Sequence, residues 1–113
     1  MGKINSRQKG ARAEREVAKI LTEKGFEARR GQQFSGSPDS PDVICAALDG
    51  FHLEVKHVEK LNIHDAIAQA ERDSRADQIP TVVHRKNKTK WLVTLSLDNF
   101  LTLVENESDD TRN

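Results

Sequence analysis

Two carboxylates and a lysine are the residues of this chain best suited to act together chemically. Glu54 and Lys56 stand two positions apart in the stretch FHLEVK, and side chains at that spacing point to the same face of a β-strand. Asp42 precedes an apolar run that ends at Asp49-Gly50, a dipeptide typical of two-residue hairpins. A hairpin at this point would bring Asp42 beside Glu54 and Lys56, at one end of a sheet.

Such a pair of carboxylates predicts a cation site. Neighbouring carboxylates repel each other and hold protons more tightly unless a cation joins them. Mg²⁺ takes oxygen ligands and commonly uses one or two carboxylates together with water and phosphate, which suits this set better than zinc. The adjacent lysine would orient or deprotonate a water and stabilise charge on a phosphate. The set therefore predicts phosphodiester hydrolysis, with an ordinary surface ion pair between Glu54 and Lys56 as the structural alternative.

The dipeptide Pro-Asp occurs twice in SPDSPDVICAAL, and the two copies have different surroundings. Pro38-Asp39 lies in a segment rich in Gly and Ser and has nothing apolar directly after it, which is typical of a turn. Pro41-Asp42 directly precedes the apolar run Val-Ile-Cys-Ala-Ala-Leu, so Asp42 is expected at a strand end. We therefore interpret Asp39 as a loop residue and Asp42 as the metal ligand.

Glu14 is expected on the apolar face of the first helix. Val17, Ala18 and Leu21 follow it at helical spacings of three, four and seven, so all four share one face. An acid on a buried face is costly without a partner. Glu14 is therefore either paired to a buried base or directed to the metal pocket, and the nearby carboxylates favour the pocket.

Periodicity and turn signals predict the element order αβββαββα in one α/β domain, a mixed central sheet flanked by helices over residues 1–104. The expected helices cover residues 11–24, a stripe that follows the capping residue Asn62, and residues 97–104. The expected strands cover residues 26–30, 42–48, 51–58, 81–84 and 91–95. The acidic residues 105–113 are expected to form a disordered tail.

Composition limits the kind of protein. The 113 residues suffice for one core, and no apolar run approaches the roughly 20 residues that span a bilayer. Cys45 is the one cysteine, which excludes an internal disulfide and fits a reducing cytoplasm. His52, His57 and His64 have no ligand spacing with a cysteine, and we assign them no metal.

Basic residues are concentrated at one end of a chain whose formal net charge is zero. Residues 1–35 contain nine Lys or Arg and four Glu, a net charge of +5. Uneven charge of this kind can present a basic face to an anionic partner. A second basic group lies at the turn expected near residues 86–90, where phosphate contacts and a solvated loop are both reasonable. The predicted nucleic-acid contacts are Arg7, Lys9, Arg12, Arg30, Arg85, Lys86 and Lys88.

The chain resembles the PD-(D/E)XK nuclease superfamily, and within it the archaeal-type Holliday junction resolvases and related small phage nucleases. The resemblance covers about residues 7–75 and implies a restriction-endonuclease-like core. The matching motifs, in chain order, are Lys9-Gly10, Glu14-Arg15, Gly25-Phe26, Arg30, Ser35-Gly36, Pro41-Asp42-Val43-Ile44 and Glu54-Val55-Lys56. Each motif is short, but their order and spacing are those of the family.

The resemblance also implies roles for single residues. Asp42, Glu54 and the backbone carbonyl of Val55 would bind Mg²⁺, for which Mn²⁺ can substitute, and Lys56 would act on the water. Glu14 would contact the metal directly or through water. Three further positions match weaker family features: Ser35 a loop serine that assists activity, Arg30 a basic residue near the scissile phosphate, and Gln69 a polar residue that orients the site. A simple surface glutamine is the alternative for Gln69.

These features together predict a Mg²⁺-dependent DNA endonuclease that acts as a homodimer on branched DNA. A general or nicking nuclease with the same site chemistry is one alternative. A nucleic-acid-binding module whose carboxylates are only structural is another.

Overall fold

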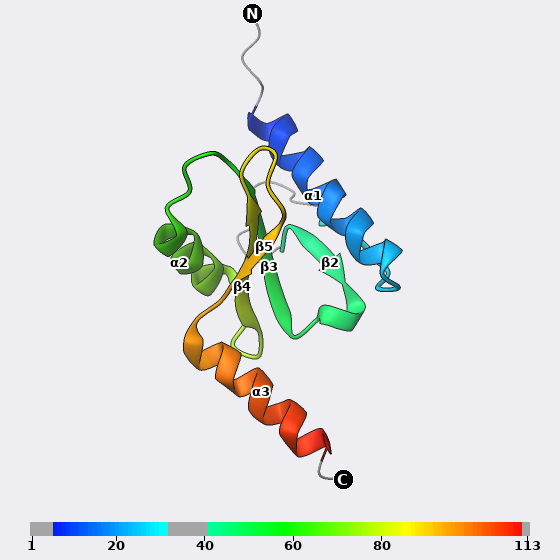
Figure 1. Ribbon diagram of the computed structural model, residues 1–113, viewed down its shortest axis with the longest axis vertical. Helices are drawn as coiled ribbons and strands as arrows, with labels where there is room; N and C mark the ends of the chain where they lie inside the picture. The colour runs from blue at the N-terminus through cyan, green and yellow to red at the C-terminus, as the bar shows by residue number, and fades with distance from the viewer. Residues whose placement is uncertain (1–5, 32–40, 112–113) are drawn as a thin grey trace, which may run out of the picture.

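The computed structural model describes residues 6–31 and 41–111, and it has the expected order of helices and strands. Figure 1 shows strands at the centre with α1 and α2 on opposite sides. The elements in chain order are α1 (Ser6–Glu23), β1 (Ala28–Arg30), β2 (Val43–Cys45), η1 (Ala46–Leu48), β3 (Phe51–His57), α2 (Ile63–Asp73), β4 (Ile79–Arg85), β5 (Leu92–Thr94) and α3 (Leu97–Thr111).

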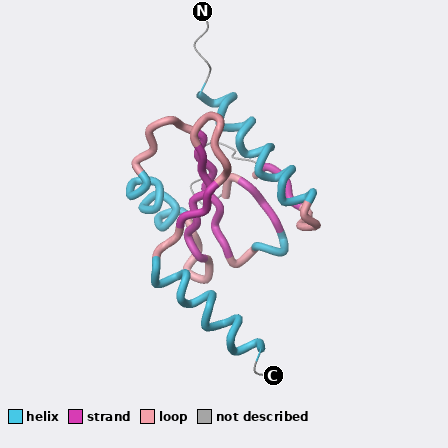
Figure 2. The backbone as a smooth tube through the Cα atoms, in the orientation of Figure 1, coloured by secondary structure: helices cyan, strands magenta, loops and turns pink. Residues whose placement is uncertain are grey.

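The strands form two small sheets that lie together at the centre of the molecule (Figure 2). β1 and β2 pair antiparallel, and the order in the other sheet is β3-β4-β5. β3 and β4 are parallel, whereas β4 and β5 are antiparallel, so this sheet is mixed as predicted. The parallel pair is joined by α2, because parallel neighbours need a crossover connection.

The expected hairpin at Asp49-Gly50 is wrong in detail. The strand after Asp42 ends at Cys45, and residues Ala46–Leu48 turn into a short 3₁₀ helix before Gly50. β2 pairs with β1 rather than with β3. Alanine has low β propensity, and Ala46 and Ala47 both face solvent, so nothing in this part of the run favours a continued strand.

The first and last helices are longer than the sequence analysis expected. α1 begins at Ser6 rather than at residue 11, because Arg, Gln and Lys in its first turns are good helix formers. α3 continues past residue 104 to Thr111 and therefore includes most of the segment 105–113 that was assigned to a disordered tail. α2 begins where predicted, with the Asn62 side chain accepting a hydrogen bond from the Asp65 amide at 3.1 Å. No helix in the described part of the chain is long and apolar enough to cross a membrane.

β3 separates two unequal packing layers. Leu53 and Val55 point toward α1, where they join Val17 and Ala18 in the larger apolar core. The alternate residues of β3 point toward α2, which contributes the smaller cluster of Ala66, Ala70 and Val82. Glu54 lies opposite Val82 in the parallel register, so a carboxylate faces this second layer. β3 thus carries an apolar face and a buried polar face.

A glycine allows the end of β1 to approach the segment that carries Asp42. The Gly31 amide donates to the Asp42 carbonyl oxygen at 2.9 Å, which continues the β1-β2 pairing. A Cβ atom at position 31 would overlap the carbonyl oxygen of Pro41. Gly31 is therefore required at this position because of the close approach of two backbones.

We expect Gly31→Ala to destabilise the fold by about 1–3 kcal/mol, because backbone atoms must move to admit the methyl group. The free energy of unfolding from urea titration measures this change. Gly10→Ala is the matched control, since a Cβ at Gly10 meets nothing within 4 Å, and alanine favours a helix by roughly 1 kcal/mol over glycine. Equal stability of Gly31→Ala and the wild type would contradict the assigned backbone approach.

Candidate active site

Asp42 is fixed against β3 by two hydrogen bonds of its own. Its amide donates to the Leu53 carbonyl oxygen at 3.0 Å, and its Oδ2 atom accepts from the Val55 amide at 2.8 Å. The side chain is buried, with the residue 6% exposed. A carboxylate in this position replaces the backbone carbonyl that a neighbouring strand would have offered. Asp42 therefore lies beside the edge of β3, next to Glu54.

The environment of Asp42 favours its protonated form. Burial and the charge of Glu54 raise the pKa of Asp42 to about 7, and Glu14 adds to the rise. The hydrogen bond from Val55 and the charge of Lys56 act in the opposite direction, but they are weaker. Glu54 itself is only 3% exposed. Two buried carboxylates thus lie close enough for the charge of one to raise the pKa of the other.

Lys56 is held by a side chain from α2. Its Nζ atom donates to Gln69 Oε1 at 3.0 Å, and the lysine is half-buried. Because Lys56 and Glu54 share one face of β3, the amine points into the same layer as the carboxylate. Gln69 thus has a partner within the candidate site and lies where it can set the direction of the lysine side chain.

Glu14 pairs with a basic residue and also lies near the predicted carboxylates. Its Oε1 atom accepts from Arg30 Nε at 2.7 Å, and the arginine side chain is 40% exposed. Glu14 also lies near enough to Asp42 to raise the pKa of that carboxyl group. It is therefore paired with a base and directed toward the carboxylates. Arg30, predicted as a phosphate contact, forms this ion pair at the rim.

The sequence analysis did not select His52 and Asp73. His52 Nε2 lies 2.8 Å from Glu54 Oε1, and the imidazole is fully buried. Strand alternation is the signal in the sequence that places His52 on the same face as Glu54, whereas its spacing from Cys45 gives no such indication. Asp73 is the last residue of α2 and comes close to His52 and Glu54 only through the fold.

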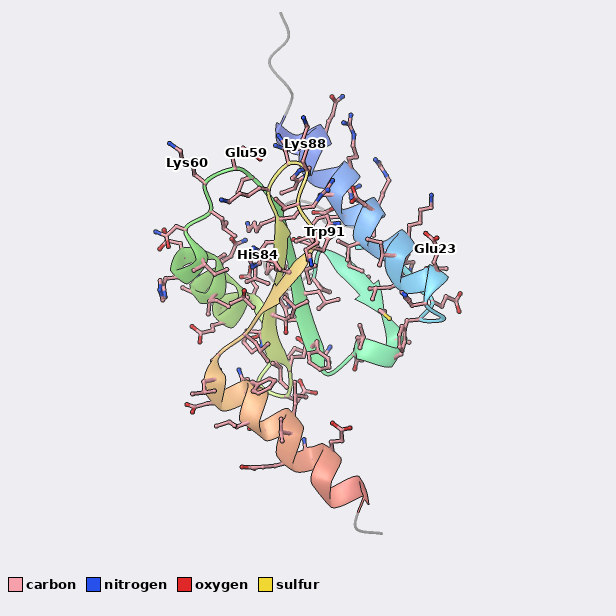
Figure 3. All side chains as sticks on the ribbon, viewed as in Figure 1. Glu23, Glu59, Lys60, His84, Lys88 and Trp91 are labelled. Carbon is pink, nitrogen blue, oxygen red and sulfur yellow. The ribbon has the colours of Figure 1, made fainter. Side chains whose placement is uncertain are left out.

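Two of the predicted basic contacts lie on an exposed turn. Lys86 and Lys88 belong to the turn between β4 and β5, at the end of the sheet where Lys56 pairs in register with His84. Figure 3 shows Lys88 at the tip of this turn, on the same side of the molecule as Glu59 and Lys60. The Asn87 amide donates to Glu59 Oε2 at 2.6 Å and joins the two loops.

Arg85 differs from these lysines and turns inward. Its Nη2 atom lies 3.3 Å from Glu16 Oε1, and its guanidinium lies 5.2 Å from the centre of the Trp91 ring. Trp91 donates from Nε1 to the same Glu16 oxygen at 2.8 Å and packs against the larger core. Arg85 therefore stabilises the contact between α1 and the sheet, and its role as a nucleic-acid contact stays a prediction.

The remaining predicted positions lie on α1 or outside the described residues. Arg12 is exposed and Lys9 is half-buried, both in the first half of α1. Ser35, Asp39 and the side chain of Arg7 fall outside the part of the chain that the structure describes. The structure thus brings together Asp42, Glu54 and Lys56 with Glu14 and Gln69 at their edge.

Comparison with known proteins identifies a family and solved structures of similar fold. The family described as "Phage putative PDDEXK endonuclease" matches residues 5–112. A solved structure of Hjc from Archaeoglobus fulgidus, a Holliday junction resolvase, is similar in fold, with a TM-score of 0.52 and 21% identity. The similarity covers 74% of this chain and 73% of Hjc. A comparison with curated protein sequences gives no match. With a family match over almost its whole length and a restriction-endonuclease-like fold, the chain belongs to the phage PDDEXK endonucleases.

Proposed function

We propose that the protein is a Mg²⁺-dependent endodeoxyribonuclease. Asp42, Glu54 and Lys56 form the proposed site at which it hydrolyses phosphodiester bonds. The observation that carries this proposal is the position of Asp42. Its Oδ2 atom accepts from the Val55 amide at 2.8 Å. This hydrogen bond fixes the carboxylate at β3 beside Glu54 and Lys56, the two neighbours of Val55 in the strand. The family to which the chain belongs supports the endonuclease assignment.

The donor atoms near Asp42 suit a hard divalent cation. Asp42 and Glu54 offer carboxylate oxygens, and the Val55 carbonyl is the proposed third ligand from the chain. Burial and the neighbouring Glu54 raise the pKa of Asp42, and a cation between the two carboxylates would favour their charged forms. Mg²⁺ fits this donor set, and Mn²⁺ can replace it. When bound, such an ion acts as a Lewis acid toward a phosphodiester.

Lys56 is the residue proposed to act on the attacking water. Its amine shares a face of β3 with Glu54 and is directed by Gln69 Oε1 at 3.0 Å. An amine there can orient the attacking water and stabilise the negative charge that grows on the phosphate. Glu14, anchored by Arg30, contributes a further acidic group at the edge of the site. Lys86, Lys88 and Arg12 lie on exposed surfaces suited to phosphate contacts away from the scissile bond.

Branched DNA is the proposed substrate. The similar structure, Hjc, is a Holliday junction resolvase, and this chain shares its fold at 21% identity. A general or nicking nuclease with the same residues is the alternative, because the site chemistry does not depend on the shape of the DNA. Cleavage of a four-way junction, the matched duplex and a single strand, each with Mg²⁺ and with EDTA, separates these substrates.

We also propose that the protein acts as a homodimer through α3. Leu97, Phe100, Leu101 and Val104 form an exposed apolar stripe at helical spacing, with Leu97 69% exposed. α3 makes no extensive contact with another described element and extends away from the sheets (Figure 1). An isolated helix of this length is marginal in water, so its apolar face needs a partner.

The same chain offers an apolar cavity that could accept this stripe in a second copy. The cavity has a volume of about 290 Å³, opens between α1 and β5, and is lined in part by Ile20, Trp91 and Val93. Val93 is 62% exposed, so this face of β5 is uncovered. Exposed Lys19 lies on the same helix as Ile20 and exposed Lys24 follows the end of that helix, whereas α3 carries Asp98, Glu105 and Glu107. Reciprocal insertion of α3 would cover both apolar surfaces and pair opposite charges.

Asp42→Asn, Glu54→Gln and Lys56→Ala should each reduce cleavage by at least about 100-fold while DNA binding stays within a few fold. The loss follows from removing a metal ligand or the group that acts on the water. Cleavage of labelled junction DNA and gel-shift binding with Ca²⁺ measure the two effects separately. Asp49→Asn is the matched control, since Asp49 is exposed and remote from the three residues. Cleavage at the wild-type rate in Asp42→Asn would exclude this site, and no cleavage by the wild type with Mg²⁺ or Mn²⁺ would favour a binding module.

The raised pKa of Asp42 predicts opposite pH dependences for stability and metal binding. Without metal, the folded protein holds the Asp42 proton more tightly than the unfolded chain, whose pKa is near 3.8. This contribution to stability is complete below pH 3.8 and is lost as the pH rises through about 7. Metal binding needs the carboxylate, so metal affinity should rise by about tenfold per pH unit up to pH 7.

Thermal unfolding and calorimetric Mn²⁺ titration between pH 5.5 and pH 8 measure the pH dependence of stability and of metal affinity. Asp42→Asn should flatten both profiles. Metal affinity that stays constant over this pH range in the wild type would contradict the prediction.

Phe100→Asp should convert the dimer to a monomer, with at least a roughly 30-fold weaker association, because a central aromatic side chain is replaced by a charge. Sedimentation equilibrium at several protein concentrations measures the change. Thr102→Asp adds the same charge on the other side of α3 and should leave the dimer intact. A wild-type protein that sediments as a monomer at high concentration would contradict the dimer.

A further inference from the structure

We propose that His52, Glu54 and Asp73 form a second cation site, for a divalent transition-metal ion, on the α2 side of β3. The site rests on the proposed function only in that Glu54 is shared with the Mg²⁺ site. The ligand atoms of the three side chains all lie within 4.8 Å of one another. Two of the residues come from one strand and the third from the last turn of α2.

Strand alternation and the α2 crossover bring the three side chains together. His52 and Glu54 are two positions apart on β3 and therefore point to the same face, and His52 Nε2 lies 2.8 Å from Glu54 Oε1. Both residues are almost fully buried. Asp73 is half-buried, so it links the buried pair to solvent and offers a path for an ion.

The charges and hydrogen bonds of this cluster are incomplete in the protein alone. His52 Nδ1 is buried and has no hydrogen-bond partner among the described residues. Unpaired buried polar atoms are uncommon, and a bound water or ion is one explanation for them. The ion pairs within the described part of the chain give Glu54 no lysine or arginine partner and leave Asp73 without any. Asp73 also ends α2, where the negative end of the helix dipole disfavours a carboxylate.

The donor set indicates the class of ion. One imidazole and two carboxylates suit Mn²⁺, Fe²⁺ or Zn²⁺ better than Mg²⁺, which prefers oxygen alone. Nitrogen and oxygen ligands lie about 2.0–2.2 Å from such ions, so two atoms that share an ion are separated by roughly 3–4 Å. The ligand atoms of the three residues lie within 4.8 Å of one another. A small movement of the Asp73 side chain would therefore bring them to the separation that a shared ion needs. A cation here would also hold the Glu54 carboxylate that faces Asp42.

The test is the binding of Mn²⁺ to the whole protein, followed without DNA. Equilibrium dialysis gives the number of ions per chain, and pulsed electron paramagnetic resonance detects ¹⁴N directly bonded to Mn²⁺. The wild type should bind two ions, of which one carries the nitrogen coupling. Asp73→Asn should lose the nitrogen-coupled ion and keep the other one. Asp42→Asn should weaken the other ion and keep the nitrogen coupling.

His52→Gln should also lose the coupled ion, and two variants on α2 serve as matched controls. His64→Gln and Glu71→Gln change exposed residues of the same types and should leave both ions in place. Circular dichroism checks the fold of each variant. The wild-type spectrum requires no substitution, so it remains decisive if His52→Gln does not fold.

Several outcomes would overturn the second site. Wild-type protein with no ¹⁴N coupling to bound Mn²⁺ would show that His52 only hydrogen-bonds to Glu54, with a proton in place of the metal. Unchanged ion number and coupling in Asp73→Asn would remove Asp73 from the ligand set and with it the proposed site. Failure of the proposed nuclease site has a different signature, because Mn²⁺ binding would then be unaffected by Asp42→Asn.

Discussion

The hydrogen bond from the Val55 amide to Asp42 Oδ2 is the interaction on which the rest of the site depends. A buried amide at the edge of β3 needs an acceptor, and here the acceptor is a carboxylate rather than the carbonyl of a neighbouring strand. The Asp42 amide completes the contact by donating to the Leu53 carbonyl oxygen. The same atoms thus satisfy the backbone of β3, join the β1-β2 pair to the larger sheet, and fix a carboxylate beside Glu54.

This arrangement gathers acidic groups at a buried position, where burial and the Glu54 carboxylate raise the pKa of Asp42. The cluster of Glu16, Arg85 and Trp91 shows the opposite case, in which a carboxylate receives both a guanidinium and an indole N–H. Glu16 therefore ties α1 to the sheet. Asp42 accepts from the Val55 amide and lies near two other acids, and its pKa rises to about 7. Ionisable groups with strongly shifted pKa values tend to occur at functional sites.

The two faces of β3 explain how so small a domain has both a core and a site. Leu53 and Val55 bury apolar surface against α1, while His52, Glu54 and Lys56 lie toward α2. The polar face is tolerated because its side chains bind one another or residues of α2, as His52 binds Glu54 and Lys56 binds Gln69. Small residues of α2, Ala66 and Ala70, allow the helix to come close enough for these contacts.

The sequence was enough to predict the order of elements and the two faces of β3, and it indicated Asp42, Glu54 and Lys56 as the candidate site residues. These depend on local rules: a period of two in a strand, a period of three to four in a helix, and the residue types that cap and turn. Contacts between residues that are distant in sequence depend on the tertiary structure, and these local rules do not predict them. The alanines after Cys45 replaced the expected hairpin by a 3₁₀ turn, yet Asp42 still reached β3 through its own side chain. Arg85 turned inward because Glu16 and Trp91, distant in sequence, meet it there. Asp73 joined His52 and Glu54 only because α2 crosses back over β3, and no spacing along the chain encodes that approach.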